Sequence, residues 1–456
     1  MKSISDILSV KVLSISPSYK EFGPDEIIAA SSKATFKKET IENILKSLSE
    51  EEIEKIHEES TRRGHATVSS LPSIDVIFQG TRVLDYFFTS FRYTRALILS
   101  SRRINYTLDD CFIPESIKNT EYESVFENII RKQYNFYKTL LDEKFPKDEC
   151  RKILPLAFRS QGLIKLPLDI VVYLCSLNQN EYLPDEILNF ASQLKEEIPK
   201  NAQKLFSKKF QSPVVSIYPF PNIFSDSKIS SEVTEVVDYI VDPEIRKERF
   251  LERIKRDYEN MRREDFYRNL SSSLMARIAI QYYKELSLSA FNEEKRHASI
   301  DMNVESIYNA LERVISFLKE DFSGISDISR ELYIPYSIKN SEMYTQYLDL
   351  IFQSLETYDK LIHEGVPQKD AVYIIPQAIK VRLIGLLNSY HIFDPLGYIS
   401  IRTCSKTDSE LRDSTIRLEE KIKIILPEYR DFIGPKCKLG YCLEKVPCLT
   451  LLAYTR

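Results

Sequence analysis

The stretch from Lys295 to Tyr308 places an arginine, a histidine and a serine where they could bind an anion. It reads K-R-H-A-S-I-D-M-N-V-E-S-I-Y, so Arg296 and His297 are adjacent, and Ser306 follows Arg296 by ten residues. An arginine fork, an imidazole and a hydroxyl together suit a phosphate or the polar edge of a flavin. An Arg-His pair in a helical run is more often a solvated helix face, and these residues alone leave that alternative open.

The composition is typical of a soluble protein and limits the classes of function. The chain has 456 residues, enough for about two or three domains. Its net charge of −4 argues against a nucleic-acid-binding surface. The sequence contains no apolar run of about 18 residues that would cross a membrane, and residues 1–16 do not resemble a signal peptide. Seven cysteines, an odd number, favour a reduced, cytoplasmic protein.

Glycine usage excludes the common phosphate-binding loops. The chain has only 10 glycines and contains neither G-x-G-x-x-G nor G-x-x-x-x-G-K-[ST]. Any phosphate must therefore be held by side chains, and the arginines are the residues to consider.

An internal duplication organises the chain. Residues 113–119 read I-P-E-S-I-K-N, and residues 334–340 read I-P-Y-S-I-K-N, an offset of 221. Between 113–157 and 334–378, 15 of 45 positions are identical without a gap, where chance would give about 3. Each copy is predicted to have a long helix, at about 120–143 and 341–364, followed by a proline turn and a second helix.

Periodicity predicts the remaining elements. Helices are expected over 24–61 and 407–425, and the alternation over 73–78 predicts a strand. Apolar residues over 83–99 favour a buried helix. The range 270–291 is also interpreted as helical, which would leave the second copy without the equivalent strand. Three prolines mark a connector between the copies at 207–242.

The motifs resemble the flavin-dependent thymidylate synthases, in a long form with two copies. That family's signature is Arg-His-Arg, seven residues, then Ser, and here Ala298 stands in place of the second arginine. Further resemblances, in the family's order, lie at 64–67, 365–376, 401–412 and 434–442, with Asn388 twelve residues after Pro376. The resemblance implies an α+β fold of two tandem repeats, 1–206 and 243–456, dominated by helices with small, mostly antiparallel sheets.

The resemblance also implies an activity. The family methylates dUMP at carbon 5 with FAD, taking the carbon from methylene-tetrahydrofolate and the electrons from NADPH. No enzyme nucleophile is expected, because the cofactor carries the difficult chemistry and the protein binds and polarises. This agrees with the absence of a Cys-His or Ser-His-Asp constellation that could be proposed from the sequence.

The implied site residues come from both copies. Arg151 in the first copy corresponds to a dUMP-binding arginine, whereas Val372 occupies that place in the second. Arg402 corresponds to the arginine that activates uracil and binds substrate. The proposed flavin contacts are His65, Thr67, Arg296, His297 and Asn388, and Ser306 is expected to bind substrate. Because the family's sites form between subunits of a tetramer, a chain with two copies is expected to be a homodimer.

Several departures keep a second hypothesis open. Ala298, Val372, Pro167 at the position equivalent to Asn388, and Asp408 near a usual Gln each remove a donor or change a charge. A non-catalytic paralogue that binds flavin or nucleotide, or acts as a scaffold, would tolerate them. Individually, Arg151, His65, Ser306 and Arg402 could have structural roles. No metal site is expected, because the spacing of Cys437, Cys442 and Cys448 is wider than usual for zinc.

Overall fold

The computed structural model divides the chain into two compact units. It describes residues 1–62, 71–89, 91, 93–179, 181–199, 202–207, 232–319, 325–440, 442 and 448. Unit 1 comprises Met1–Lys138, Leu154–Phe220 and Asp349–Pro376, and unit 2 comprises Thr139–Ile153, Pro221–Leu348 and Gln377–Arg456. Each unit therefore combines most of one copy with a short segment of the other. Within the described ranges, no helix combines the length and the apolar composition needed to cross a bilayer.

Unit 1 is built around a four-stranded antiparallel sheet with the order β2-β3-β6-β4. Its strands are β1 (Lys2–Ser3), β2 (Ser9–Ser16), β3 (Ser73–Thr81), β4 (Arg95–Ile98), β5 (Phe112–Ile113) and β6 (Arg159–Pro167). Its longer helices are α1 (Pro24–Ala34), α2 (Ile41–Ser47), α3 (Glu50–Arg62), α5 (Arg82–Phe88), most of α6 (Glu123–Asp142), α8 (Leu168–Cys175), α9 (Asp185–Glu197), α10 (Gln203–Ser207) and most of α17 (Tyr344–His363). The shorter ones are η1 (Ile4–Asp6), η2 (Leu108–Asp110), α18 (Gln368–Ala371) and η6 (Val372–Ile374).

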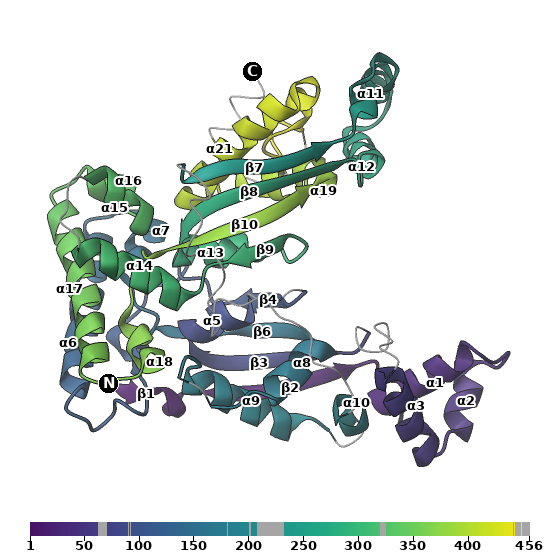
Figure 1. Ribbon diagram of the computed structural model, residues 1–456, viewed down its shortest axis with the longest axis horizontal. Helices are drawn as coiled ribbons and strands as arrows, with labels where there is room; N and C mark the ends of the chain where they lie inside the picture. The colour runs from purple at the N-terminus through teal and green to yellow at the C-terminus, as the bar shows by residue number, and fades with distance from the viewer. Residues whose placement is uncertain are drawn as a thin grey trace. The chain divides into compact units, whose positions relative to one another are not determined.

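The core of unit 1 follows from the alternation of β3. Ile74, Val76 and Phe78 are fully buried, whereas Ile77 between them is 41% exposed. Helices α8 and α9 cover the buried face (Figure 1), where the ring of Phe78 lies 6.4 Å from that of Phe190. The strand predicted over 73–78 is confirmed, and it extends to Thr81.

Unit 2 repeats this plan with the sheet β7-β8-β10-β9, which is also antiparallel. Its strands are β7 (Thr234–Val241), β8 (Ile278–Ser287), β9 (Asp301–Val304) and β10 (Lys380–Asn388). Its longer helices are α11 (Glu248–Asn260), α12 (Arg263–Ser273), α13 (Leu288–Glu294), α14 (Ile307–Lys319), α15 (Ile325–Glu331) and α21 (Ser409–Ile425). The shorter ones are α7 (Lys147–Cys150), η3 (Arg151–Ile153), η5 (Pro243–Arg246), α16 (Tyr336–Lys339), α19 (Ser389–Phe393), α20 (Tyr398–Arg402) and η7 (Pro427–Phe432).

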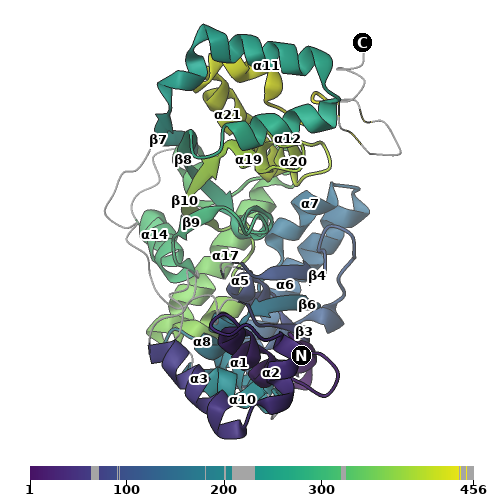
Figure 2. The ribbon, with the colours of Figure 1, turned by 90° about the vertical axis from the view of Figure 1, so that its right-hand side faces the viewer.

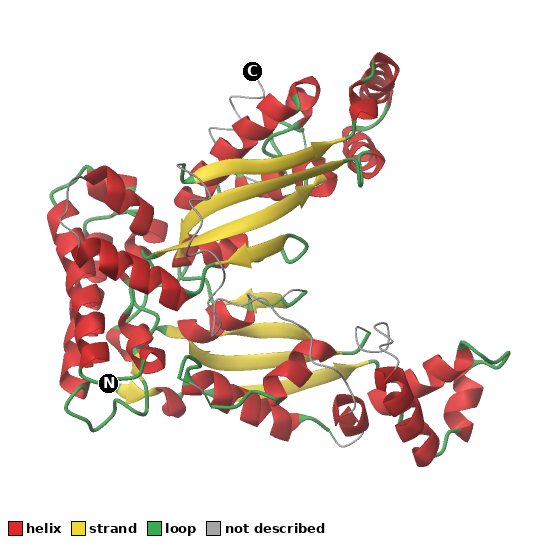
Figure 3. Ribbon diagram, in the orientation of Figure 1, coloured by secondary structure: helices red, strands yellow, loops and turns green. Residues whose placement is uncertain are grey.

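Helix α21 covers one face of this sheet next to β7, and α11 and α12 lie together at one end of it (Figure 2). Leu411 and Leu418 on α21 are fully buried, as are Ile280 on β8 and Leu383 on β10. Figure 3 shows the two sheets, each with its own helices. The fold is α+β with two tandem repeats, as the sequence predicted.

Two predicted helices are wrong in part. The range 270–291 contains β8 between α12 and α13, so the second copy has kept its strand. The last six residues of β8 are buried on both faces, and a strand buried on both faces lacks the alternation by which strands are recognised. The range 83–99 is helical only in α5 and then forms β4. The predicted connector 207–242 lies largely outside the described residues, and its last part forms β7.

The duplication is visible in the boundaries of the elements. The offset of 221 carries α6 onto α17, α7 onto α18, η3 onto η6 and β6 onto β10, residue for residue. An offset of 206 carries α5 onto α13 and β4 onto β9. The matched elements therefore have equal lengths in the two copies. The segment between them differs, since η2 and β5 of the first copy stand where the second has α14, α15 and α16.

Three contacts within unit 1 join a residue to its own counterpart in the other copy. Lys132 Nζ donates to Gln353 Oε1 at 3.0 Å, and Gln133 Nε2 donates to Ser354 Oγ at 2.9 Å. Pro155 and Pro376 form an isolated bridge. Each pair differs by 221 in number. Contacts of a position with its own equivalent are the mark of a two-fold arrangement, so α6 and α17 pack here around a local pseudo-two-fold axis.

Candidate functional site

Unit 2 brings the predicted substrate arginine of the first copy into a buried ion cluster of the second. Arg151 begins η3, directly after α7, and is 5% exposed. Its Nη2 donates to Asp408 Oδ2 at 2.5 Å and to Glu293 Oε1 at 3.1 Å. Glu293 lies on α13, and Asp408 is the N-cap of α21. Residues far apart in the sequence therefore meet at one guanidinium.

The next residue extends this cluster. Lys152 is fully buried, and its Nζ donates to Glu410 Oε2 at 2.7 Å, to Ser287 Oγ at 3.1 Å and to Asp408 Oδ1 at 3.4 Å. Glu410 in turn accepts the backbone N–H of Ser287 at 2.7 Å. The carboxylate of Asp408 thus bridges Arg151 and Lys152.

Arg402 reaches the same cluster through Glu293. Its Nη2 donates to the carbonyl oxygen of Glu293 at 2.6 Å, and its Nη1 lies 3.8 Å from Glu293 Oε2. The two arginines predicted to bind and activate the substrate therefore share one carboxylate, that of Glu293. Neither Glu293 nor Lys152 was identified from the sequence, because an acid on a buried helix carries no local signal of its distant partners.

The charges of this ion cluster balance. Among the described residues, the members are Arg151, Lys152, Glu293, Arg402, Asp408 and Glu410, formally three cations and three anions. Burial raises the pKa of Asp408, but Lys152 and Arg151 together outweigh burial and hold that pKa well below its usual range. Asp408 is therefore ionised at neutral pH, and it is a full competitor for any other anion at Arg151.

A second buried cluster lies beside the histidine of the signature. Lys284 Nζ donates to the hydroxyl of Tyr398 at 2.5 Å, and that hydroxyl donates to Glu294 Oε2 at 2.6 Å. Burial lowers the pKa of Lys284 to about 8, against the opposing effect of Glu294. The ring of His297 meets that of Tyr398 edge-on, with centroids 5.1 Å apart. His297 is thereby fixed in orientation by packing.

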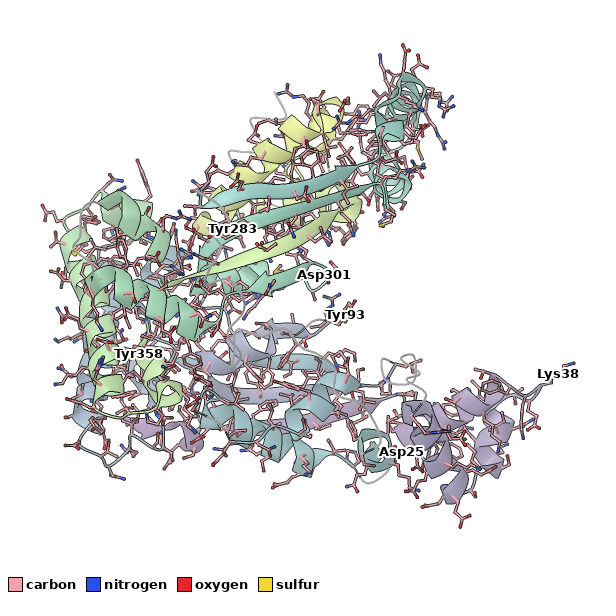
Figure 4. All side chains as sticks on the ribbon, viewed as in Figure 1. Asp25, Lys38, Tyr93, Tyr283, Asp301 and Tyr358 are labelled. Atoms are coloured by element: carbon pink, nitrogen blue, oxygen red, sulfur yellow. The ribbon has the colours of Figure 1, made fainter. Side chains whose placement is uncertain are left out.

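The signature residues differ in exposure. Arg296 is exposed and His297 is half-buried, whereas Ala298 is only 8% exposed. They follow α13 and precede β9, the edge strand whose first residue, Asp301, is labelled in Figure 4, as is Tyr283 on β8. A guanidinium open to solvent beside an oriented imidazole offers donors that fit the phosphates and the acceptor-rich edge of a flavin.

Two other predicted residues have capping roles. Ser306 is fully buried, and its Oγ accepts the N–H of Tyr308 at 3.2 Å as α14 begins. Asn388 caps α19, with Oδ1 accepting from Tyr390 N at 3.1 Å and from His391 N at 3.4 Å. The Asn388 cap uses only the oxygen, so the donors of its side-chain amide are not engaged by it. Ser306 therefore has a structural contact at the start of α14, and its role in substrate binding stays a prediction.

Unit 1 has an equivalent of this cluster without its paired cations. Glu186 accepts Thr81 N at 2.6 Å and the hydroxyl of Tyr373 at 2.9 Å, as Glu410 accepts from Ser287 and Lys152. Tyr373 is the counterpart of Lys152, and Val372 that of Arg151, by the offset of 221. Burial raises the pKa of Glu186 to about 7 despite these donors. The paired cations are thus present in unit 2 and replaced in unit 1.

The constant offset of 206 also aligns the two signatures. It places Ser90, Phe91 and Arg92 opposite Arg296, His297 and Ala298, and Ser100 opposite Ser306. The first copy has therefore kept the second signature arginine, in sequence, where the second copy has lost it. Residues 90 and 92 lie outside the described residues, as do the predicted flavin contacts His65 and Thr67.

Comparison with known proteins decides the family. A model of thymidylate synthase complementing proteins (Thy1) matches residues 19–202 and 251–428. The chain belongs to the Thy1 family. The two matched segments of this Thy1 protein correspond to its two copies, and each contains three of the four strands of one sheet.

Individual relatives match shorter parts of the chain at low sequence identity. This Thy1 protein is 28% identical over 144 residues to a flavin-dependent thymidylate synthase of Thermococcus onnurineus, covering 29% of this chain and 57% of the relative. It is 30% identical over 127 residues to that of Pyrococcus furiosus, covering 26% and 50%. It therefore spans about half the length of these curated relatives. A solved UMP/dUMP methylase from Streptomyces cacaoi is 13% identical with a TM-score of 0.35, covering 45% of this chain and 97% of that one, which is too weak a likeness to support an argument.

Proposed function

We propose that this Thy1 protein methylates dUMP to dTMP with FAD, NADPH and methylene-tetrahydrofolate, as a homodimer in the cytoplasm. The observation that carries the proposal is the meeting of Arg151 from the first copy with Glu293, which also holds Arg402 of the second copy, in unit 2. The separate losses of the two copies, Val372 in one and the counterpart of Arg402 in the other, are compatible with a single site built from both.

The residues of the cluster have distinct roles in this proposal. Arg151 binds the phosphate of dUMP through charge-assisted hydrogen bonds. Arg402 polarises the uracil ring, because a fixed cation stabilises negative charge that develops on a carbonyl oxygen. Glu293 is a positioning residue, since it holds both guanidinium groups at once.

Arg296, His297 and Asn388 would hold the flavin, with His65 and Thr67 assigned to it by resemblance. When bound, the flavin supplies the redox chemistry and carries the transferred carbon. The segment after α13 supplies the donors, with Arg296 exposed, and the packing of His297 against Tyr398 keeps one donor oriented.

Release of tritium from carbon 5 of labelled dUMP tests the proposal directly. The purified protein with FAD, NADPH and methylene-tetrahydrofolate should release tritium, and omission of any one component should stop the release. Arg402→Ala should abolish turnover, whereas Arg268→Ala, an exposed arginine paired with Glu264 on its own helix, should not change it. A colourless protein that takes up no FAD would contradict the proposal.

The second candidate function is a paralogue that binds flavin or nucleotide without catalysis. Ala298 and the carboxylates of Glu293 and Asp408 favour it, because the first removes a signature cation and the others neutralise Arg151. A yellow protein that releases no tritium under the complete conditions would establish this alternative.

A further inference from the structure

The anion subsite of unit 2 is filled by the protein's own carboxylates. Arg151 is the cation through which a phosphate would be bound, and its Nη2 is shared by Asp408 at 2.5 Å and Glu293 at 3.1 Å. Asp408 turns its other oxygen to Lys152 at 3.4 Å. One aspartate thus occupies two adjacent buried cations, as one phosphate group would.

The charge balance of the cluster means that a phosphate has to compete with these carboxylates. A nucleotide phosphate carries close to two negative charges at neutral pH, and it would enter a buried cluster whose described members are already three cations and three anions. Uncompensated buried charge is strongly unfavourable. Binding therefore requires that a carboxylate give up its cation.

Asp408 is the carboxylate best placed to do so. Glu293 is needed by Arg402, and Glu410 is held by Ser287 and Lys152. Asp408 caps α21 through Oδ1, which accepts Leu411 N at 3.3 Å, and this contact does not involve Arg151. An uncharged side chain with an oxygen at the same place would keep the cap and leave Arg151 to the ligand.

We infer that Asp408 is an internal competitor for the phosphate subsite and sets the affinity and charge preference of the nucleotide ligand. The inference rests on the proposed function, in that it takes dUMP as the ligand. It predicts that removing an acidic residue from the site strengthens the binding of substrate.

The test compares Asp408→Asn with the wild type by titration calorimetry, using dUMP and uncharged deoxyuridine. Asp408→Asn should bind dUMP about tenfold more tightly or better, which corresponds to the removal of one competing charge-assisted contact. Deoxyuridine affinity should not change. Asp148→Asn is the matched control, because Asp148 accepts Ser409 N at the start of the same helix and its carboxylate is not one that holds Arg151. It should leave both affinities unchanged.

Three outcomes would overturn the inference. These are an unchanged dUMP affinity in Asp408→Asn, a weakened one, or an equal gain for deoxyuridine, which would indicate a wider pocket and not a freed cation. Thermal melts confirm that each variant is folded. Since calorimetry requires no turnover, a protein that binds dUMP as described but releases no tritium refutes the proposed activity and leaves the competition intact. If neither the wild type nor Asp408→Asn binds dUMP, the inference and the proposed function both fail, whereas an unchanged dUMP affinity in a protein that releases tritium refutes the inference alone.

Discussion

Replacing Arg151 by methionine should destabilise the protein by leaving buried acids without their cation. The substitution keeps the length of the side chain but removes the guanidinium, so Glu293 and Asp408 stay buried. Removal of one partner from a buried ion pair costs about 3–5 kcal/mol. Lys152 still approaches Asp408 and Arg402 still approaches Glu293, so the expected loss is about 3 kcal/mol.

Thermal unfolding measures this loss. For a domain of this size, about 1 kcal/mol lowers Tm by about 2–4 °C, so Arg151→Met should lower it by about 6–12 °C. Arg268→Met is the matched control, since Arg268 is 60% exposed and pairs with Glu264 on its own helix; exposed pairs contribute about 0–1 kcal/mol. If the two variants melt within about 2 °C of each other, the ion cluster does not stabilise the fold as argued.

A double variant and a pH series separate charge from packing. Adding Asp408→Asn to Arg151→Met should recover part of the loss, because the acid left unpaired is then neutral. The folded-state pKa of Asp408 lies below the ordinary aspartate pKa of 3.8, so the contribution of Asp408 to stability is present above pH 3.8 and is lost as the pH falls through the folded-state pKa. The cost of Arg151→Met should therefore be full at neutral pH and shrink below pH 3.8.

Three further predictions concern neighbouring residues. Arg402→Ala should weaken dUMP binding by about 1.5–3 kcal/mol, or about 10- to 150-fold, in calorimetry, and an unchanged affinity would remove Arg402 from the site. Burial lowers the pKa of His391 to about 4, so wild-type stability should fall as the pH falls from 6.5 towards 4. The free energy of unfolding, measured by urea titration, should therefore change less between about pH 5 and pH 7 in His391→Gln than in the wild type. An equal change in the two proteins would contradict this. Burial lowers the pKa of Lys284 from 10.5 to about 8, so the unfolded state binds more protons between these values and stability should rise with pH there. Lys284→Met should lose that rise, and a variant that retains it would show that another group is responsible.

The sequence predicted the repeats because they depend on local signals. The offset of 221, the long helices and the strand at 73–78 rest on identity and periodicity, and these survive in the printed sequence. Strand β8 was missed because Lys284 and Glu285 are buried within it against distant partners. In the sequence, charged residues within a strand that is buried on both faces give the same pattern as the exposed face of a helix.

The candidate site was predictable only in part. Arg151 and Arg402 could be proposed from their motifs, and the structure brings both to Glu293. The acid itself lies 142 residues from Arg151, and no pattern in one sequence relates such positions. Asp408 was noticed as a departure from the family, but its contact with Arg151 could not be foreseen. The capping roles of Ser306 and Asn388 depend on where α14 and α19 begin, which is the least reliable part of any helix prediction.

The exchange of segments between the units affects how the two copies are inherited. Residues 139–153 of the first copy belong to unit 2, and residues 349–376 of the second belong to unit 1. A gene cut between the copies would encode two fragments, each without a strip of its own core, so we expect neither to fold alone and both to recover when mixed. Each copy can then discard a residue that the other supplies. Every such loss makes a return to a single-copy ancestor harder, because each copy then depends on residues that only the other copy retains.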